Sequence, residues 1–182
     1  MKKLLMAGLI LTVALLGACS NNEPKLETKE DIKAYVQDFY NQFSDIEQES
    51  DSSKEDFDAA MTSFSSGDVS DKEFSKAVDA FQDTADKLAD KVEDVKISSK
   101  LPDDIQKLLE DSKVAFLSAY QLKEQASQSA VSAEVTADQF KAMTDNADLA
   151  MLFGISKLNE ARVATGLIDA DAAVDISELT KQ

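Results

Sequence analysis

The residue types that most often carry out enzyme chemistry are scarce in this chain. The 182-residue sequence contains no histidine and no tryptophan, and its single cysteine is Cys19. Without histidine there can be no Ser-His or Cys-His nucleophile, and the His ligands of zinc sites and di-iron bundles are missing too. Glycine-rich phosphate loops are also absent. We therefore predict that the protein is not an enzyme and needs no cofactor.

Carboxylates are the one chemically active group in abundance, with 35 Asp and Glu residues. Glycosidase-type catalysis needs one carboxyl group in an apolar pocket, and the sequence singles out no such acid. Asp169, Asp171 and Asp175 look like the start of a calcium loop. However, the fifth and sixth loop positions hold Ala173 and Val174, where an EF-hand needs an oxygen ligand and a glycine. We expect no metal site.

Cys19 follows an apolar segment at the start of the chain. Two lysines after Met1 precede an apolar run over residues 4–16, which is the layout of a secretory leader. A membrane-spanning helix needs about 20 apolar residues, so this run is too short to be one. The run ends in Leu16, Gly17, Ala18 and Cys19. This quartet resembles the bacterial lipobox, in which a leucine and two small residues precede the modified cysteine.

The lipobox resemblance covers only the first 19 residues and implies a lipoprotein precursor. It implies a leader over residues 1–18 that is cleaved, and a diacylglyceryl group on the Cys19 thiol. Because two acyl chains hold a protein stably on a membrane, the lipid would anchor the domain at the extracytoplasmic face of the cell membrane. Residues 19–27, which are polar and contain Pro24, are then expected to form a flexible tether.

The charge of the mature chain limits its partners. Without Lys2 and Lys3, the 19 basic residues fall to 17 against 35 acids, a formal charge of −18. Phosphate backbones and anionic lipid headgroups repel such a surface. We expect no nucleic-acid partner and anchoring through the lipid alone. The acids are interpreted as a solvated surface, with a cationic peptide or protein face as the alternative.

Apolar residues spaced by threes and fours predict four long helices in a bundle domain over residues 28–166. Short connections between long helices favour antiparallel neighbours, so we predict an all-α, up-down-up-down four-helix bundle. An acidic tail follows over residues 167–182, with a short helix expected over 171–179. Helix boundaries are indicated by capping boxes, a proline and two glycines: Thr28 with Asp31, Ser70 with Glu73, Thr136 with Gln139, Pro102, Gly67 and Gly166.

The first predicted helix is unusually long. Its apolar pattern lapses over residues 49–53 and resumes at Phe57, and Ser52 with Glu55 could cap a new helix. We therefore expect either one long helix or a kink or break near 49–53, and favour the kink or break.

The fourth predicted helix departs from the simple bundle pattern. Residues 149–155 are apolar on every side, whereas an ordinary surface helix has one apolar stripe. One interpretation is that this helix is central and buried, which we favour. The other is an exposed patch for a protein partner. The candidate patch residues are Leu152, Phe153 and Ile155, rimmed by Asn159 and Arg162.

Two main functional hypotheses follow, and a third, an acid-dependent hydrolase, would need two carboxylates that face each other in a cleft. The first is a non-enzymatic, membrane-anchored helical module that binds another protein of the cell envelope. The second is a bundle that holds a small apolar ligand between its helices, lined by Phe116, Tyr120, Met143 and Met151. A cavity between the third and fourth helices would favour the ligand, and a filled core with Leu152 or Phe153 exposed would favour the partner. The sequence does not indicate an oligomeric state.

Overall fold

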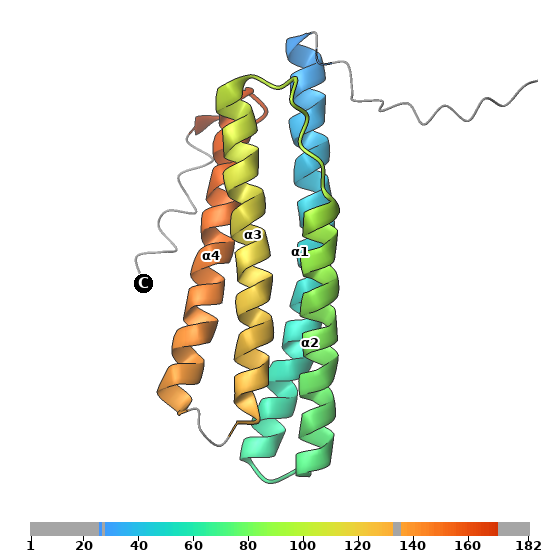
Figure 1. Ribbon diagram of the computed structural model, residues 1–182, viewed down its shortest axis with the longest axis vertical. Coiled ribbons are helices and arrows are strands. Elements are labelled where there is room, and N and C mark those ends of the chain that lie inside the picture. The colour runs from blue at the N-terminus through green and yellow to red at the C-terminus, as the bar shows by residue number, and fades with distance from the viewer. Residues whose placement is uncertain (1–25, 27, 133–135, 171–182) are drawn as a thin grey trace, which may run out of the picture.

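The computed structural model is an all-helical bundle, and it describes residues 26, 28–132 and 136–170 (Figure 1). Its helices are α1 (Lys29–Ser65), α2 (Asp71–Asp94), α3 (Asp103–Ala130) and α4 (Ala137–Ala164). They run up-down-up-down, and each packs on the next along the chain, whereas α1 and α4 touch only slightly. The predicted bundle is therefore confirmed. The lipobox with Cys19 and the helix expected over 171–179 lie outside the described residues.

The predicted helix boundaries are confirmed by their hydrogen bonds. Thr28, Ser70 and Thr136 each form a capping box with the residue three positions on. Gly67 and Gly166 follow α1 and α4 with φ values of +79° and +71°. In both, the glycine N–H and the next N–H donate back to the helix end, which is the Schellman arrangement. Glycine suits this position because left-handed backbone costs other residues a steric clash.

The predicted break near residues 49–53 is wrong, because α1 is one continuous helix of 37 residues. The apolar pattern lapses there because polar contacts replace apolar ones. Ser50 is only 2% exposed and accepts a hydrogen bond from Lys123 of α3 at 3.0 Å. One residue earlier, Glu49 pairs with Lys91 of α2 at 2.6 Å. The segment therefore still packs against the bundle, and a capped restart at Ser52 is not needed.

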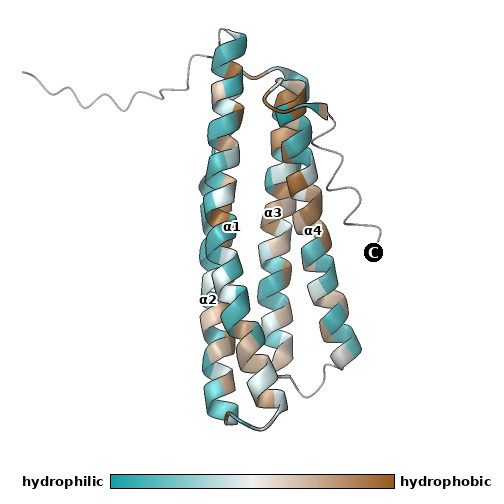
Figure 2. Ribbon diagram, turned by 180° about the vertical axis from the view of Figure 1, so that it is seen from behind, coloured by the Kyte–Doolittle hydropathy of each residue, from teal (hydrophilic) through white to brown (hydrophobic). Residues whose placement is uncertain are grey.

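Hydrophobic and hydrophilic residues alternate along each helix, as expected of helices with one buried face (Figure 2). The buried apolar residues form two clusters along the bundle axis. The larger one joins all four helices, and the smaller one lies towards the α1–α2 loop. The smaller cluster consists of Phe57, Phe74, Val78 and Phe81, with Ala60, Met61, Ala130 and Phe140 packed against it.

Among the described residues, no helix is both long and apolar enough to cross a membrane.

At Gly154, α3 and α4 lie close together. A β-carbon built on this residue would lie 2.9 Å from the Phe116 ring and 3.3 Å from the Ser112 carbonyl oxygen. The buried Ser112 hydroxyl also donates to the Gly154 carbonyl at 2.8 Å. Only glycine lets the two backbones approach this closely. The interpretation of α4 as a buried helix therefore holds for the face that contains Gly154.

Candidate functional site

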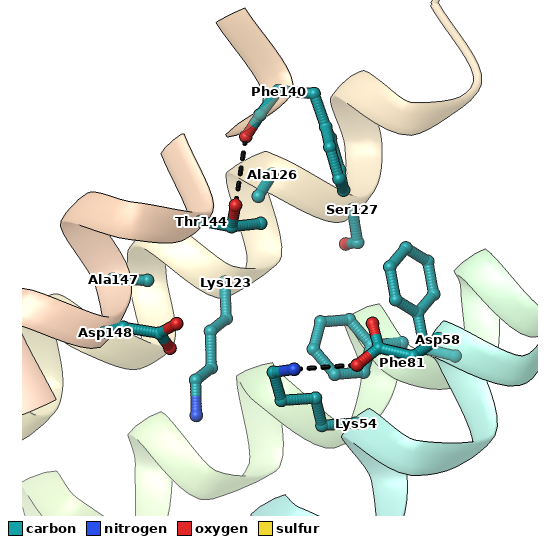
Figure 3. Close-up of a pocket in the computed structure, with 11 residues that line it drawn as sticks. Lys54, Asp58, Phe81, Lys123, Ala126, Ser127, Phe140, Thr144, Ala147 and Asp148 are labelled. Atoms are coloured by element: carbon teal, nitrogen blue, oxygen red, sulfur yellow. Dashed lines mark hydrogen bonds and ion pairs between the residues drawn. The ribbon is translucent and has the colours of Figure 1, made fainter. Parts of the chain in front are cut away.

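A cavity of about 170 Å³ lies between the four helices, in the half of the bundle near the α1–α2 loop (Figure 3). It opens to solvent, and every helix contributes to its wall. The lining residues are Lys54, Phe57 and Asp58 from α1, Phe81 from α2, Lys123, Ala126 and Ser127 from α3, and Phe140, Thr144, Ala147 and Asp148 from α4.

The cavity exists because small residues face large ones across the bundle. Ala126 and Ala147 are 2% and 1% exposed and leave room where a larger side chain would fill the core. The facing wall is aromatic, with the rings of Phe57 and Phe81 stacked at 4.7 Å between centroids. Phe140 adds a third ring from α4. An apolar wall of this kind suits an apolar ligand body.

Two pairs of charged residues also line the cavity, and they differ in how well they are neutralised. Lys54 donates to Asp58 at 2.7 Å, and this hydrogen bond raises the pKa of the Lys54 ammonium. Figure 3 shows the Lys123 side chain between this pair and the carboxylate of Asp148. The cavity wall therefore contains one ion pair joined by a hydrogen bond, Lys54 with Asp58, and a second pair of oppositely charged residues, Lys123 and Asp148.

Lys123 is half-buried, and its ammonium makes few direct contacts. It donates to the neutral Ser50 hydroxyl at 3.0 Å and lies 5.3 Å from the centre of the Tyr120 ring. Burial lowers the pKa of Lys123, because an apolar environment disfavours the charged amine. The nearby carboxylates of Glu47 and Asp148 oppose this effect without cancelling it.

Glu47 and Tyr120 form a hydrogen bond beside Lys123. The Tyr120 hydroxyl, on a fully buried side chain, donates to Glu47 Oε1 at 2.9 Å. Burial raises the pKa of Glu47, although the hydrogen bond and the Lys123 charge act in the opposite direction. Burial and the Glu47 charge together raise the pKa of the Tyr120 hydroxyl. These residues form a polar cluster next to the cavity, and Tyr120 belongs to the larger apolar cluster as well.

The predicted patch on the fourth helix is divided between two faces of α4. Ile155 packs against the core, and Asn159 is 8% exposed. Arg162 lies over the Tyr40 ring of α1 at 3.9 Å and donates from Nη1 to Asn159 Oδ1 at 3.1 Å. Leu152 is half-buried. The predicted rim therefore faces the bundle instead of solvent.

Phe153 lies on the outer face of α4 next to Leu149, which was not among the candidate patch residues predicted from the sequence. Phe153 is 52% exposed and Leu149 is 56% exposed. Residues four apart share one face of a helix, so these two side chains are neighbours on the surface. The Lys157 ammonium lies 5.4 Å from the centre of the Phe153 ring.

The residues proposed to line a ligand site are not those that line the cavity. Phe116, Tyr120 and Met151 are buried in the larger apolar cluster, and Met143 is half-buried. The sequence did contain one signal for the true position. Lys123 continues the spacing of the apolar stripe through Phe116 and Tyr120, so a lysine stands where a core residue is expected.

Within the part of the chain that the structure describes, no group of His, Cys, Asp or Glu could hold a metal ion. Comparison with protein-family models, with curated proteins and with solved structures returned no match. The geometry of the bundle therefore carries the functional proposal.

Proposed function

We propose that this protein is a lipid-anchored, non-enzymatic module at the extracytoplasmic face of the cell membrane that binds another protein of the envelope. The lipobox sequence ending in Cys19 supports the anchor. The adjacent exposed side chains of Leu149 and Phe153 support the binding surface, because large apolar groups in contact with water often mark interaction sites. This exposed pair is the observation on which the proposal rests.

The charge around the exposed pair indicates the chemistry of the partner. Glu160 and Asp145 lie on the same helix, each paired with a lysine at 2.8 and 2.6 Å. Without the leader, which contains Lys2 and Lys3, the chain carries a formal charge of 17 − 35 = −18. A complementary protein would therefore present an apolar pocket for Phe153, surrounded by basic side chains that the acidic field attracts.

Crosslinking in the native membrane, followed by capture and mass spectrometry, tests this proposal. We expect a reproducible crosslinked partner with Phe153 near the crosslink, and a diacylglyceryl group on Cys19 in the same spectra. The Phe153→Asp variant should lose that partner while keeping its helical circular dichroism, because a charge at the centre of an apolar contact abolishes it.

Val114→Asp is the matched control, since Val114 is 63% exposed on α3. It introduces the same charge on another surface and should keep the partner. Equal loss of the partner in both variants, or capture of the partner by the folded Phe153→Asp variant, would contradict the proposed surface. Unmodified Cys19 would contradict the anchor.

A second candidate function is the binding of a small apolar ligand, which the cavity specifically favours. Its volume of about 170 Å³ exceeds that of an engineered protein cavity of about 150 Å³ that binds benzene. The ligand would therefore be about the size of a single ring. Saturable stabilisation of the protein by toluene, lost when Ala147→Leu fills the cavity, would support this function.

A further inference from the structure

Arg162 is the only arginine in the chain, and no carboxylate pairs with it in the part of the molecule that the structure describes. Its guanidinium lies over the Tyr40 ring at 3.9 Å, and Nη1 donates to Asn159 Oδ1 at 3.1 Å. Nε is buried without a hydrogen-bond partner among the described residues. The helix dipole favours a cation in the last turn of α4, but a guanidinium pairs best with a planar carboxylate, and the chain has 35 acids. Arg162 therefore keeps donors available for an anion from outside the chain.

A groove of about 210 Å³ lies between α1 and α4, next to this guanidinium. Two of the residues that line it, Tyr40 and Asn159, are the residues that contact Arg162. Its lining is mainly apolar, with Phe43, Phe116, Ile155 and Leu158, and the polar lining residues are Tyr40, Ser44, Glu47 and Asn159. The groove shares no lining residue with the cavity of about 170 Å³, so it is a separate site.

The polar side chains near Arg162 can all donate a hydrogen bond into the groove. Asn159 Oδ1 is already bonded to Arg162, which leaves the amide nitrogen Nδ2 as the donor of this side chain. The hydroxyls of Tyr40 and Ser44 have no acceptor among the described residues. This end of the groove therefore combines a positive charge with uncommitted donors, as an anion requires.

The other end of the groove is acidic. Glu47 lies seven residues after Tyr40 on α1, roughly 10 Å away at 1.5 Å per residue. Its carboxyl group already accepts a hydrogen bond from Tyr120 at 2.9 Å. A bound anion would be repelled from Glu47 and attracted to Arg162, so the groove sets the direction in which a ligand lies.

We propose that this groove binds a small organic acid, in which a carboxylate is carried on an apolar body. The carboxylate lies at the Arg162 end, within reach of Asn159 Nδ2, and the apolar body lies along Phe43 and Ile155. An engineered cavity of about 150 Å³ holds benzene, so a groove of about 210 Å³ has room for one ring with a short acidic arm. Because the acidic surface of the protein repels free anions, both the apolar contacts and the guanidinium are needed for binding.

Arg162 provides its own probe, because isotope-labelled arginine gives a single Nε–H signal in the NMR spectrum of this chain. The full-length lipidated protein in a non-ionic detergent is titrated with 3-phenylpropionate, which should shift this signal saturably. The isosteric 3-phenylpropionamide should bind about tenfold more weakly, since hydrogen bonds to charged groups are stronger than neutral ones. Acetate, which lacks the ring, should leave the signal unchanged at the same concentrations. No saturable shift, or equal affinity for the acid and either of the other two compounds, would overturn the proposal.

Three variants locate the binding site, with the Ile155 methyl signal as the reporter where the arginine is replaced. Arg162→Gln should lower the affinity for the acid to that for the amide. Lys157→Gln is the matched control, because it removes a positive charge from the same helix, where Lys157 pairs with Glu160 at 2.8 Å, and it should keep the preference for the acid. Ser44→Leu, at an exposed position of the groove, should weaken the binding of acid and amide alike, and it tests the site where Arg162→Gln does not fold.

The variants also separate this groove from the cavity of the second candidate function. A preference for the acid that survives in folded Arg162→Gln, or that disappears equally in Lys157→Gln, would overturn the proposal. Binding that is unaffected by Ser44→Leu but lost in Ala147→Leu would overturn it too, because it would place the acid in the cavity of about 170 Å³.

Discussion

Glu47 and Lys123 bring opposite charges into a part of the bundle where apolar packing would be simpler. Their mutual attraction is opposed by burial, which raises the pKa of Glu47 and lowers that of Lys123. Both pKa shifts mean that the fold disfavours the charged form of the residue. Buried ion pairs often contribute little to stability, because desolvation offsets the attraction. At the scale of single residues, we therefore interpret this pair as retained for a purpose other than stability.

The Glu47→Gln variant tests this interpretation through pH. Because the folded pKa of Glu47 is raised above its reference value of 4.5, its contribution to stability is present below that pH and is lost as pH rises through the folded pKa. Glutamine can still accept the Tyr120 hydrogen bond without carrying a charge. We expect the variant to be more stable than the wild type at pH 7 and equally stable at pH 4, as measured by urea unfolding. A less stable variant at pH 7 would show that the attraction to Lys123 outweighs burial.

Sequence reasoning at this scale found Arg162 and Phe153 but grouped them wrongly. Helical periodicity shows that Phe153 and Leu149 share a face, but it does not show which face is covered by another helix. That depends on where α1 lies against α4, which is a tertiary property. The same limit explains why Lys123 was missed as a cavity residue, since its environment is formed by three other helices.

At the scale of helices, the contact between α3 and α4 is fixed by Gly154. An added methyl group would meet the ring of Phe116, which is 1% exposed and cannot move aside, and the Ser112 backbone. Replacing glycine by alanine in a helix normally stabilises it by about 1 kcal/mol. Overpacking a filled core typically costs about 1–3 kcal/mol. The gain in helix propensity and the cost of overpacking oppose each other. Because an added methyl group would lie only 2.9 Å from the Phe116 ring and 3.3 Å from the Ser112 carbonyl oxygen, we expect the cost of overpacking to be larger.

We therefore expect Gly154→Ala to lower the free energy of unfolding, by about 1 kcal/mol net. Chemical denaturation monitored by circular dichroism measures this value. Asn146→Ala is the control, because Asn146 is exposed on the same helix and gains helix propensity without a clash. A stabilising Gly154→Ala would mean that α3 and α4 can separate at no cost.

The helix boundaries were predictable because capping is local. A Ser or Thr with an acid or amide three residues later satisfies the first N–H groups wherever the helix packs. Gly67 and Gly166 were similarly readable, since a left-handed turn needs glycine. The break expected near residue 50 failed for the opposite reason. Ser50 packs through a hydrogen bond to Lys123, and no pattern of apolar residues could show that contact.

At the scale of the whole molecule, the second half of α4 buries more residues than the first half. From residue 151 onward α4 buries Met151, Gly154, Leu158, Asn159 and Ala161, whereas over residues 138–150 it buries only Ala147. The slight contact between α1 and α4 leaves the cavity beside this first half. We infer that the two halves of α4 differ in local stability.

Hydrogen exchange at the level of single amides tests this inference. Amides of residues 140–146 should exchange faster than those of residues 155–161, because opening the first half exposes less apolar surface. A cavity ligand should slow the exchange of the first half selectively. Uniform protection along α4 would instead show that the helix opens as a single unit.

The position of the cavity along α1 has a consequence for how far the protein reaches. With 1.5 Å per residue, Lys54 lies roughly 38 Å along the helix from Lys29, where the proposed tether ends. A bundle standing upright on its lipid would hold the cavity mouth beyond the headgroup layer, whereas a bundle lying down would not. The acidic surface disfavours lying down. In an upright bundle, the length of α1 would set the height of the cavity mouth above the membrane. Lengthening or shortening α1 by whole turns would therefore move that height by about 5.4 Å per turn.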